Sequence, residues 1–178
     1  MKNKLSLLLF VFILTINISS AQVDSLRKEN KNAFNFGLGL GIDYGGFGTR
    51  FTIVPDQHAM LFIGLGYNLL GLGVNGGAGY LILPDKKVCP YIIGMYGYNA
   101  VIKIENASRY DKTYYGPSFG FGVELFNRSG KNFWNLELLL PVRPTEYEDD
   151  LRDLKNNPQI KIESEPAPLA FSVGYHFG

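Results

Sequence analysis

Large apolar residues alternate with small or polar residues along most of this chain. The last ten residues, Leu169–Gly178, read LAFSVGYHFG, with Leu, Phe, Val, Tyr and Phe at the odd positions and Ala, Ser, Gly, His and Gly at the even ones. Successive side chains of a β-strand point to opposite faces, so this pattern predicts a strand with one large apolar face and one small face. The same alternation occurs in seven earlier segments, which cover residues 34–43, 47–54, 59–68, 72–83, 88–101, 114–126 and 133–142.

Five of the seven connections between these eight predicted strands are of two kinds, and the other two are tight reversals at YGG (residues 44–46) and near Leu69–Gly71. Three are short, namely residues 55–58 (PDQH), 84–87 (PDKK) and 127–132 (NRSGKN), and contain the Pro, Asp, Asn or Gly residues that favour turns. Two are long and polar, residues 104–113 and 143–168. In the fifth segment the pattern leaves open which residues form the apolar face. One candidate set is Tyr91, Ile93 and Met95, and the other is Ile92, Tyr96 and Tyr98.

Charged residues are rare on the small-residue face of the strands. They are Asp43, Arg50, Glu124 and Glu137, and nearly every other charge lies in a turn, a loop or the N-terminal stretch. The water-facing side of a soluble barrel would carry many more charges. A large apolar exterior around a small, glycine-rich interior is typical of a transmembrane barrel, whose closure leaves no unpaired edge in lipid. We therefore predict an all-β fold in which residues 33–178 form an eight-stranded antiparallel up-and-down transmembrane β-barrel.

Aromatic residues gather near the predicted strand ends, where a ring can lie at a membrane interface. The alternative explanation is the ordinary β-propensity of aromatic residues, so the clustering only supports the barrel. The pattern places Tyr44, Tyr67 and Tyr114 at one rim, and Tyr80, Tyr91, Trp134 and Phe177 at the other.

The N-terminus has the three regions of a secretory signal peptide. Two lysines within the first four residues form the basic region, residues 5–18 are apolar, and Ser-Ser-Ala precedes Gln22 as a cleavage site. We predict a signal peptide at residues 1–21 and a periplasmic stretch at residues 22–32. A transmembrane anchor is the alternative, but an apolar run this short is marginal for a bilayer core of about 30 Å.

The composition argues against several classes of function. The net charge of the chain is +1, and removal of the two signal-peptide lysines leaves about −1 (1 − 2), so no nucleic-acid partner is predicted. Cys89 has no second cysteine with which to form a disulfide. His58 and His176 stand alone, without the spacing of metal ligands. We therefore predict no metal and no cofactor.

The chain resembles the small eight-stranded outer-membrane barrels of diderm bacteria, of the OmpA-transmembrane and OmpX type. The resemblance covers residues 33–178 and rests on the signal peptide, the even number of strands, the alternation and the last strand. In that family the last strand carries alternating aromatic residues that end in Phe and are recognised by the barrel-assembly machinery. Val173, Tyr175 and Phe177 match this assembly signal, and the additional Gly178 departs from it.

The resemblance also implies a location and an orientation. It implies an outer-membrane protein that contacts membrane lipid and lipopolysaccharide. In such barrels the short turns and both termini lie in the periplasm, and the longer loops lie outside. The three short turns of this chain would then be periplasmic, and the two long connections would both be external.

Three functions are open to such a barrel. The favoured one is a non-enzymatic structural or surface-interaction role, with a surface ligand that the sequence does not identify. The second is a narrow channel for small solutes, because glycine lines much of the lumen, although strand curvature and close packing also explain the glycines. The third is a lipid-modifying enzyme, which needs a nucleophile next to a base. Ser172 and His176 share a face but lie about 13 Å apart along the strand, and Ser118 offers only an approach across the lumen, so no catalytic residue is predicted.

Polar side chains are predicted to close the lumen. Arg50, Glu124 and Glu137 all lie on the small-residue face of their strands and should point inward. A hydrogen-bonded Arg–carboxylate pair offsets the cost of burying each charge. We therefore predict that Arg50 pairs with Glu137, Glu124 or both, with solvation of each charge by lumenal water as the alternative.

The long connection Arg143–Pro168 is the candidate interaction surface. It contains a predicted short helix, with Thr145 as the N-cap and Glu148 completing a capping box. Leu151 and Leu154 share one face of this helix, and a proline ends it. Its excess of acidic residues suggests binding of divalent cations alongside lipopolysaccharide, but a solvated charged loop is the simpler interpretation.

Overall fold

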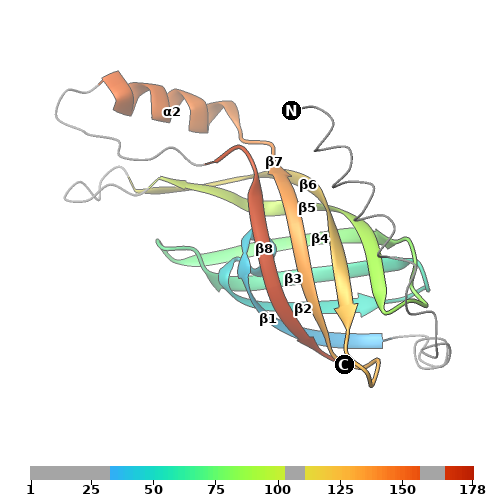
Figure 1. The fold of residues 1–178 in the computed structure, drawn as a ribbon. Helices are drawn as coiled ribbons and strands as arrows, with labels where there is room; N and C mark the ends of the chain where they lie inside the picture. Colours follow the sequence, from blue (N-terminus) through green and yellow to red (C-terminus); the bar gives the residue numbers. More distant parts are fainter. Residues whose placement is uncertain (1–32, 103–110, 157–166) are drawn as a thin grey trace, which may run out of the picture.

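Eight antiparallel strands close into a barrel in which consecutive strands pair and β8 pairs back onto β1 (Figure 1). The computed structural model describes residues 33–102, 111–156 and 167–178. The prediction of an all-β, eight-stranded antiparallel up-and-down barrel is confirmed, while the predicted signal peptide and periplasmic stretch lie outside the described residues. The strands are β1 (Ala33–Gly41), β2 (Gly46–Val54), β3 (Ala59–Tyr67), β4 (Leu72–Leu81), β5 (Val88–Ile102), β6 (Lys112–Phe126), β7 (Phe133–Pro141) and β8 (Ala170–Phe177).

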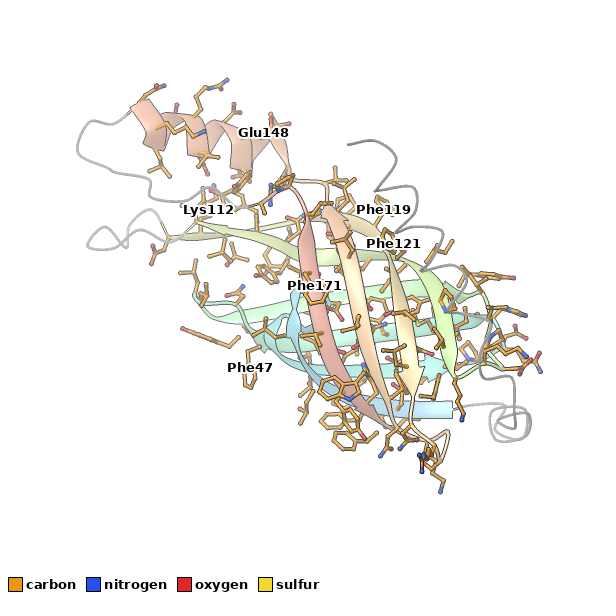
Figure 2. All side chains as sticks on the ribbon, in the orientation of Figure 1. Phe47, Lys112, Phe119, Phe121, Glu148 and Phe171 are labelled. Carbon is orange, nitrogen blue, oxygen red and sulfur yellow. The ribbon has the colours of Figure 1, made fainter. Side chains whose placement is uncertain are left out.

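The alternation that predicts the strands also determines which side chains face outward. Phe119 and Phe121 on β6 and Phe171 on β8, which are labelled in Figure 2, are 55%, 61% and 61% exposed. Every strand carries large apolar side chains on this outer face, so it surrounds the whole barrel. On the other strands they include Phe34, Leu40, Phe47, Ile53, Leu61, Ile63, Leu72, Tyr80, Ile92, Tyr96, Trp134 and Leu140.

The interior is less polar than the sequence pattern predicts. In β5 the open question of parity is resolved, because Tyr91, Ile93 and Met95 point inward while Ile92 and Tyr96 point outward. These inward residues belong to an apolar core inside the barrel. The pattern did not reveal this core, because its residues alternate with outward residues that are equally apolar. The core consists of Ile42, Val54, Met60, Phe62, Leu81, Cys89, Tyr91, Ile93, Met95 and Leu139.

The two ends of the barrel differ. The turns that join β2 to β3, β4 to β5 and β6 to β7 lie at the end where β1 begins and β8 ends, which we call the terminal end. The short β1–β2 and β3–β4 connections lie at the opposite end. At the opposite end β5 and β6 continue as a two-stranded ribbon, since β4 pairs with β5 only up to Gly97 and β7 pairs with β6 only from Ser118 onward. The helix α2 (Thr145–Asn156) lies beside this ribbon, beyond the barrel (Figure 1). Within the described residues, no helix combines the length and the apolar character needed to cross a membrane.

Three of the aromatic residues that were predicted to lie at the rims are buried instead. Tyr44, Tyr91 and Tyr114 are 0%, 1% and 3% exposed. Tyr44 and Tyr91 point into the barrel, and Tyr114 packs against α2. Each hydroxyl reaches a hydrogen-bond partner, which allows an aromatic ring with a polar tip to be buried. The remaining predicted rim residues are exposed, namely Tyr67, Tyr80, Trp134 and Phe177.

Candidate functional site: the lumen and the ribbon–helix unit

The connection between β1 and β2 folds into the barrel instead of projecting from it. Its 3₁₀ turn η1 (Ile42–Tyr44) is buried throughout. Together with Gly45 it forms what we call the plug turn, residues 42–45. Gly41, Gly45 and Gly46 have φ angles of 149°, 71° and 110°, a region that favours glycine. These residues let the chain reverse sharply at each end of the turn and enter the lumen.

Glycines on the inner faces of the neighbouring strands make room for the plug turn. A Cβ atom at Gly64 on β3 would lie 1.9 Å from the Asp43 carbonyl oxygen, and one at Gly73 on β4 would lie 2.2 Å from the Gly45 carbonyl oxygen. The Asn75 side chain of β4 also donates a hydrogen bond to the Ile42 carbonyl oxygen. The glycine-rich inner face therefore accommodates a folded segment of the chain and does not line an open lumen.

Arg50 on β2 joins the plug turn to the opposite wall of the barrel. Its Nη1 atom lies 3.0 Å from Asp43 Oδ2 and 2.5 Å from Glu137 Oε1 on β7. The guanidinium also stacks over the Phe62 ring, 4.0 Å from its centroid. Because Arg50, Asp43 and Glu137 are almost fully buried, any charge on them depends on these contacts for compensation.

Glu137 is the acceptor at the centre of this cluster. Its Oε1 atom accepts hydrogen bonds from Arg50, from the Tyr91 hydroxyl at 2.5 Å and from Asn135 Nδ2 at 3.1 Å. Three donors on one carboxylate oxygen stabilise its ionised form. The carboxylate of Glu137 thereby connects β2, β5 and β7 through the barrel interior.

Tyr44 extends the same network toward the terminal end. Its hydroxyl donates to Asn135 Oδ1 at 2.5 Å and lies 2.7 Å from His176 Nε2. The other ring nitrogen of His176, Nδ1, lies 2.8 Å from Asn35 Oδ1, and its ring stacks on Phe133 at 4.6 Å. The polar network and the apolar core together fill the interior.

The structure brings two of the three predicted lumen residues together. Arg50 and Glu137 form an ion pair, and Glu124 is buried on the inner face of β6, opposite Asn135 in the register. Asp43, the second carboxylate on Arg50, was not predicted as its partner. Sequence reasoning treated it as the end of a strand, whereas β1 ends at Gly41 and Asp43 reaches Arg50 from the plug turn.

The residues considered for catalysis or metal binding have other contacts. Ser172 and His176 are both buried on the inner face of β8, but the ring nitrogens of His176 face Tyr44 and Asn35. His58 stacks on Tyr80, and its Nδ1 atom lies 2.7 Å from the Leu81 carbonyl oxygen. In the part of the chain that the structure describes, no group of three or more His, Cys, Asp or Glu residues is placed to hold a metal ion.

The predicted assembly-signal residues lie on the outer face of β8. Phe177 is 46% exposed, and Val173 and Tyr175 are half-buried. Tyr175 packs edge-to-face against Trp134 on β7 and against Phe177. The chain ends at Gly178, whose N–H donates to Asn132 Oδ1 in the β6–β7 turn.

The ribbon and α2 form a second unit beyond the barrel, which we call the ribbon–helix unit (residues 98–102, 112–116 and 145–156). The predicted helix is present, with Thr145 as its first helical residue and Pro144 accepting a hydrogen bond from the Tyr147 N–H. As predicted, Leu151 and Leu154 face the same way. The apolar contact between helix and ribbon consists of Ala100, Ile102, Tyr114, Tyr147 and Leu154, with Leu151 packed at its edge.

Polar contacts also hold α2 on the ribbon. Lys112 Nζ lies 2.7 Å from both Glu146 and Asp150, and the Tyr114 hydroxyl donates to Asp150 at 2.7 Å. Hydrogen bonds from Lys112 and Tyr114 lower the pKa of Asp150, and the hydrogen bond to Asp150 raises the pKa of Lys112. Burial, together with the Asp150 carboxylate, raises the pKa of Tyr114.

A β-bulge sets the position of this unit relative to the barrel. The β5–β6 register shifts between Tyr98 and Ala100, so that Asn99 is the additional residue on β5. A bulge bends its strand and changes which residues face each side. The Asn99 side chain donates to the Val142 carbonyl oxygen at 2.9 Å, which ties the bulge to the end of β7.

A comparison with protein-family models found no match to this sequence, and a comparison with curated proteins found none either.

Proposed function

We propose that this chain is a non-enzymatic integral outer-membrane β-barrel protein with a closed lumen, which presents the ribbon–helix unit at the cell surface. The observation that carries the proposal is the apolar outer face, which includes large exposed side chains on every strand. Soluble monomers rarely expose continuous apolar surfaces of this kind. A closed barrel, in contrast, can expose such a surface to lipid, because every strand is paired on both sides.

The proposed orientation follows the connection lengths. The terminal end, with its short turns and both ends of the barrel chain, would face the periplasm, as in small outer-membrane barrels. The ribbon–helix unit would then lie outside the cell, next to the outer leaflet and its lipopolysaccharide. The proposed signal peptide at residues 1–21 and the proposed assembly signal at Val173, Tyr175 and Phe177 fit export to this membrane and insertion by the barrel-assembly machinery.

The packing of the interior favours a closed barrel over a channel. The plug turn occupies one part of the lumen, and the apolar core occupies another. Displacing the plug turn alone would leave large apolar side chains such as Phe62, Met95 and Leu139 inside the barrel. A structural or surface-interaction role therefore accounts for the interior better than passage of solutes.

The experiment that tests the proposal combines location, barrel stability and conductance. The protein should fractionate with the outer membrane, and the extracted protein should change its gel mobility on boiling, because a closed and fully paired barrel resists detergent until it is heated. Protein reconstituted into planar bilayers should not conduct ions above the lipid background. Recovery in the periplasm as a soluble protein would contradict the membrane assignment, and steady conductance would contradict the closed lumen.

A further inference from the structure

Acidic side chains outnumber basic ones inside the barrel. Asp43 and Glu137 are both buried and share one buried guanidinium, that of Arg50. Full ionisation of these three residues would place two carboxylates against one guanidinium in the interior. Because uncompensated buried charge is costly, at least one of these carboxylic acids is expected to be neutral.

The hydrogen bonds distinguish Asp43 from Glu137. Glu137 Oε1 accepts hydrogen bonds from Arg50, Tyr91 and Asn135, which stabilise its anion. Asp43 receives one such hydrogen bond, from Arg50 to its Oδ2 atom at 3.0 Å, and the Ser172 side chain lies close enough to interact with its carboxyl group. Its second oxygen, Oδ1, is buried and has no hydrogen-bond partner. Of these two carboxyl groups, Asp43 is therefore the one with fewer donors to stabilise its negative charge.

Two further unpartnered oxygens lie in the same part of the lumen. Ser172 Oγ and Glu137 Oε2 are buried without hydrogen-bond partners, and Ser172 is opposite Glu137 in the β7–β8 register. Ser172 also lies under the start of the plug turn, because a Cβ atom at Gly41 would be 1.9 Å from Ser172 Oγ. If Asp43 carries a proton, its carboxyl O–H can donate a hydrogen bond to Ser172 Oγ. The Ser172 hydroxyl can then donate to Glu137 Oε2.

We propose that Asp43 binds a proton in the folded barrel, and that this proton latches the plug turn to β7 and β8 through Ser172 and Glu137. The plug turn is then a proton-binding site as well as a steric closure. Loss of the proton leaves an additional negative charge in the interior and removes the donor that joins the three oxygens. The latch should therefore weaken as the pH rises.

The sign of the pH dependence follows from linkage. An unfolded Asp releases its proton near pH 3.9, while the folded barrel would keep one additional proton on Asp43 above that pH. The folded state thus binds more protons, and stability falls as the pH rises from about 4 to the pH at which folded Asp43 ionises. One bound proton changes the unfolding equilibrium by up to about tenfold per pH unit in this window.

Other titratable groups lie inside the barrel with the plug turn, and His176 is the main competitor for the proton. From the packed strands these groups are Arg50 on β2, Tyr91 on β5, Glu124 on β6, Glu137 on β7 and His176 on β8, with Tyr44 in the turn itself. The ring nitrogens of His176 lie 2.7 Å and 2.8 Å from oxygens of Tyr44 and Asn35. An additional proton on His176 would give a pH dependence of the same sign, so the test must separate the two residues.

The test is urea unfolding of the refolded full barrel between pH 4.5 and 9 (roughly the window set by linkage), for the wild type and for D43N. Asparagine keeps an acceptor for Arg50 and supplies a permanent donor toward Ser172. We expect the free energy of unfolding of D43N to equal that of the wild type at the acidic end of this pH range and to exceed it at the alkaline end. The wild type should lose stability as the pH rises, and D43N should not. A slope that persists in D43N but disappears in H176Q assigns the proton to His176 and overturns the proposal.

A second comparison keeps the proposal testable if D43N does not refold. We expect S172A to reduce the pH slope, whereas S118A should leave it unchanged, since Ser118 is equally buried on the inner face but lies on β6. The infrared carbonyl band of a protonated carboxylic acid should be present in the folded wild type at neutral pH and lost in D43N. Equal slopes in S172A, S118A and the wild type, or a band that survives in D43N, would contradict the latch.

Discussion

Arg50 Nη1 on β2 and Glu137 Oε1 on β7 lie 2.5 Å apart in the barrel interior, and the same nitrogen contacts Asp43 of the plug turn. One guanidinium thus holds two walls of the barrel and the turn between them. We expect R50A to destabilise the barrel by about 3–5 kcal/mol, because removal of one partner leaves the buried Glu137 carboxylate uncompensated. The change should appear as a lower urea midpoint of the folded barrel in detergent or lipid.

Replacing the two acids that contact Arg50, Asp43 and Glu137, by neutral amides should restore part of the stability that R50A loses. We expect the triple variant R50A/D43N/E137Q to recover part of the stability that R50A loses. The matched control is R50A/E124Q. Glu124 is also a buried acid on the inner face, and the sequence pattern predicted it as an alternative partner of Arg50. Greater recovery in R50A/E124Q than in the triple variant would show that the pairing is assigned incorrectly.

The glycines under the plug turn provide a steric prediction. G64A would place a methyl group 1.9 Å from the Asp43 carbonyl oxygen, and overpacking of this kind costs roughly 1–3 kcal/mol. G76A is the matched control in the neighbouring strand, because the nearest atom to its Cβ would be the Phe62 carbonyl oxygen at 3.7 Å. The unfolding midpoint should fall in G64A and change little in G76A, and equal midpoints would argue against a seated plug turn.

The fold was predictable because a β-strand has a period of two residues. The alternation in β8 assigns Phe171 outward and Ser172 inward, and the same rule gave the orientation of Arg50 and Glu137 correctly. Strand number and closure followed from the segments and from the need of apolar strands in lipid to leave no edge. These features depend on local pattern alone.

The features that the sequence pattern did not predict depend on the path of the chain between strands and on contacts between residues far apart in the sequence. The pattern places Asp43 in line with β1, but the chain reverses at Gly41 and enters the lumen, a path that is set by contacts with strands far along the sequence. Tyr91 has apolar neighbours on both sides, so polarity did not show which face it occupies. The bulge at Asn99 likewise reverses which of the last β5 residues point inward. No break in the alternation of the sequence marks its position.

The ribbon–helix unit should loosen in acid. Hydrogen bonds from Lys112 and Tyr114 lower the pKa of Asp150, so this contribution to stability is present above the unfolded value of about 3.9 and is lost as the pH falls through the folded value. We expect the protection factors of the α2 amides, which are exchange rates corrected for their intrinsic pH dependence, to fall below about pH 4, and D150N to show low protection already at neutral pH. D153N, which changes an exposed residue of the same helix, is the control that should behave like the wild type. Unchanged α2 exchange in D150N would contradict the role of this contact.

The last strand provides a test of assembly that is separate from stability. If Tyr175 and Phe177 belong to the assembly signal, replacing both by Ala should leave export intact and reduce the fraction inserted in the outer membrane. The F119A/F121A variant is the matched control, because it also removes two aromatic rings from the outer face, but from β6. Both variants lose a similar apolar surface for contact with lipid, so only recognition of the last strand should separate them. Equal insertion of the two variants, measured by membrane fractionation and by gel mobility before and after boiling, would mean that β8 carries no assembly signal beyond its apolar face.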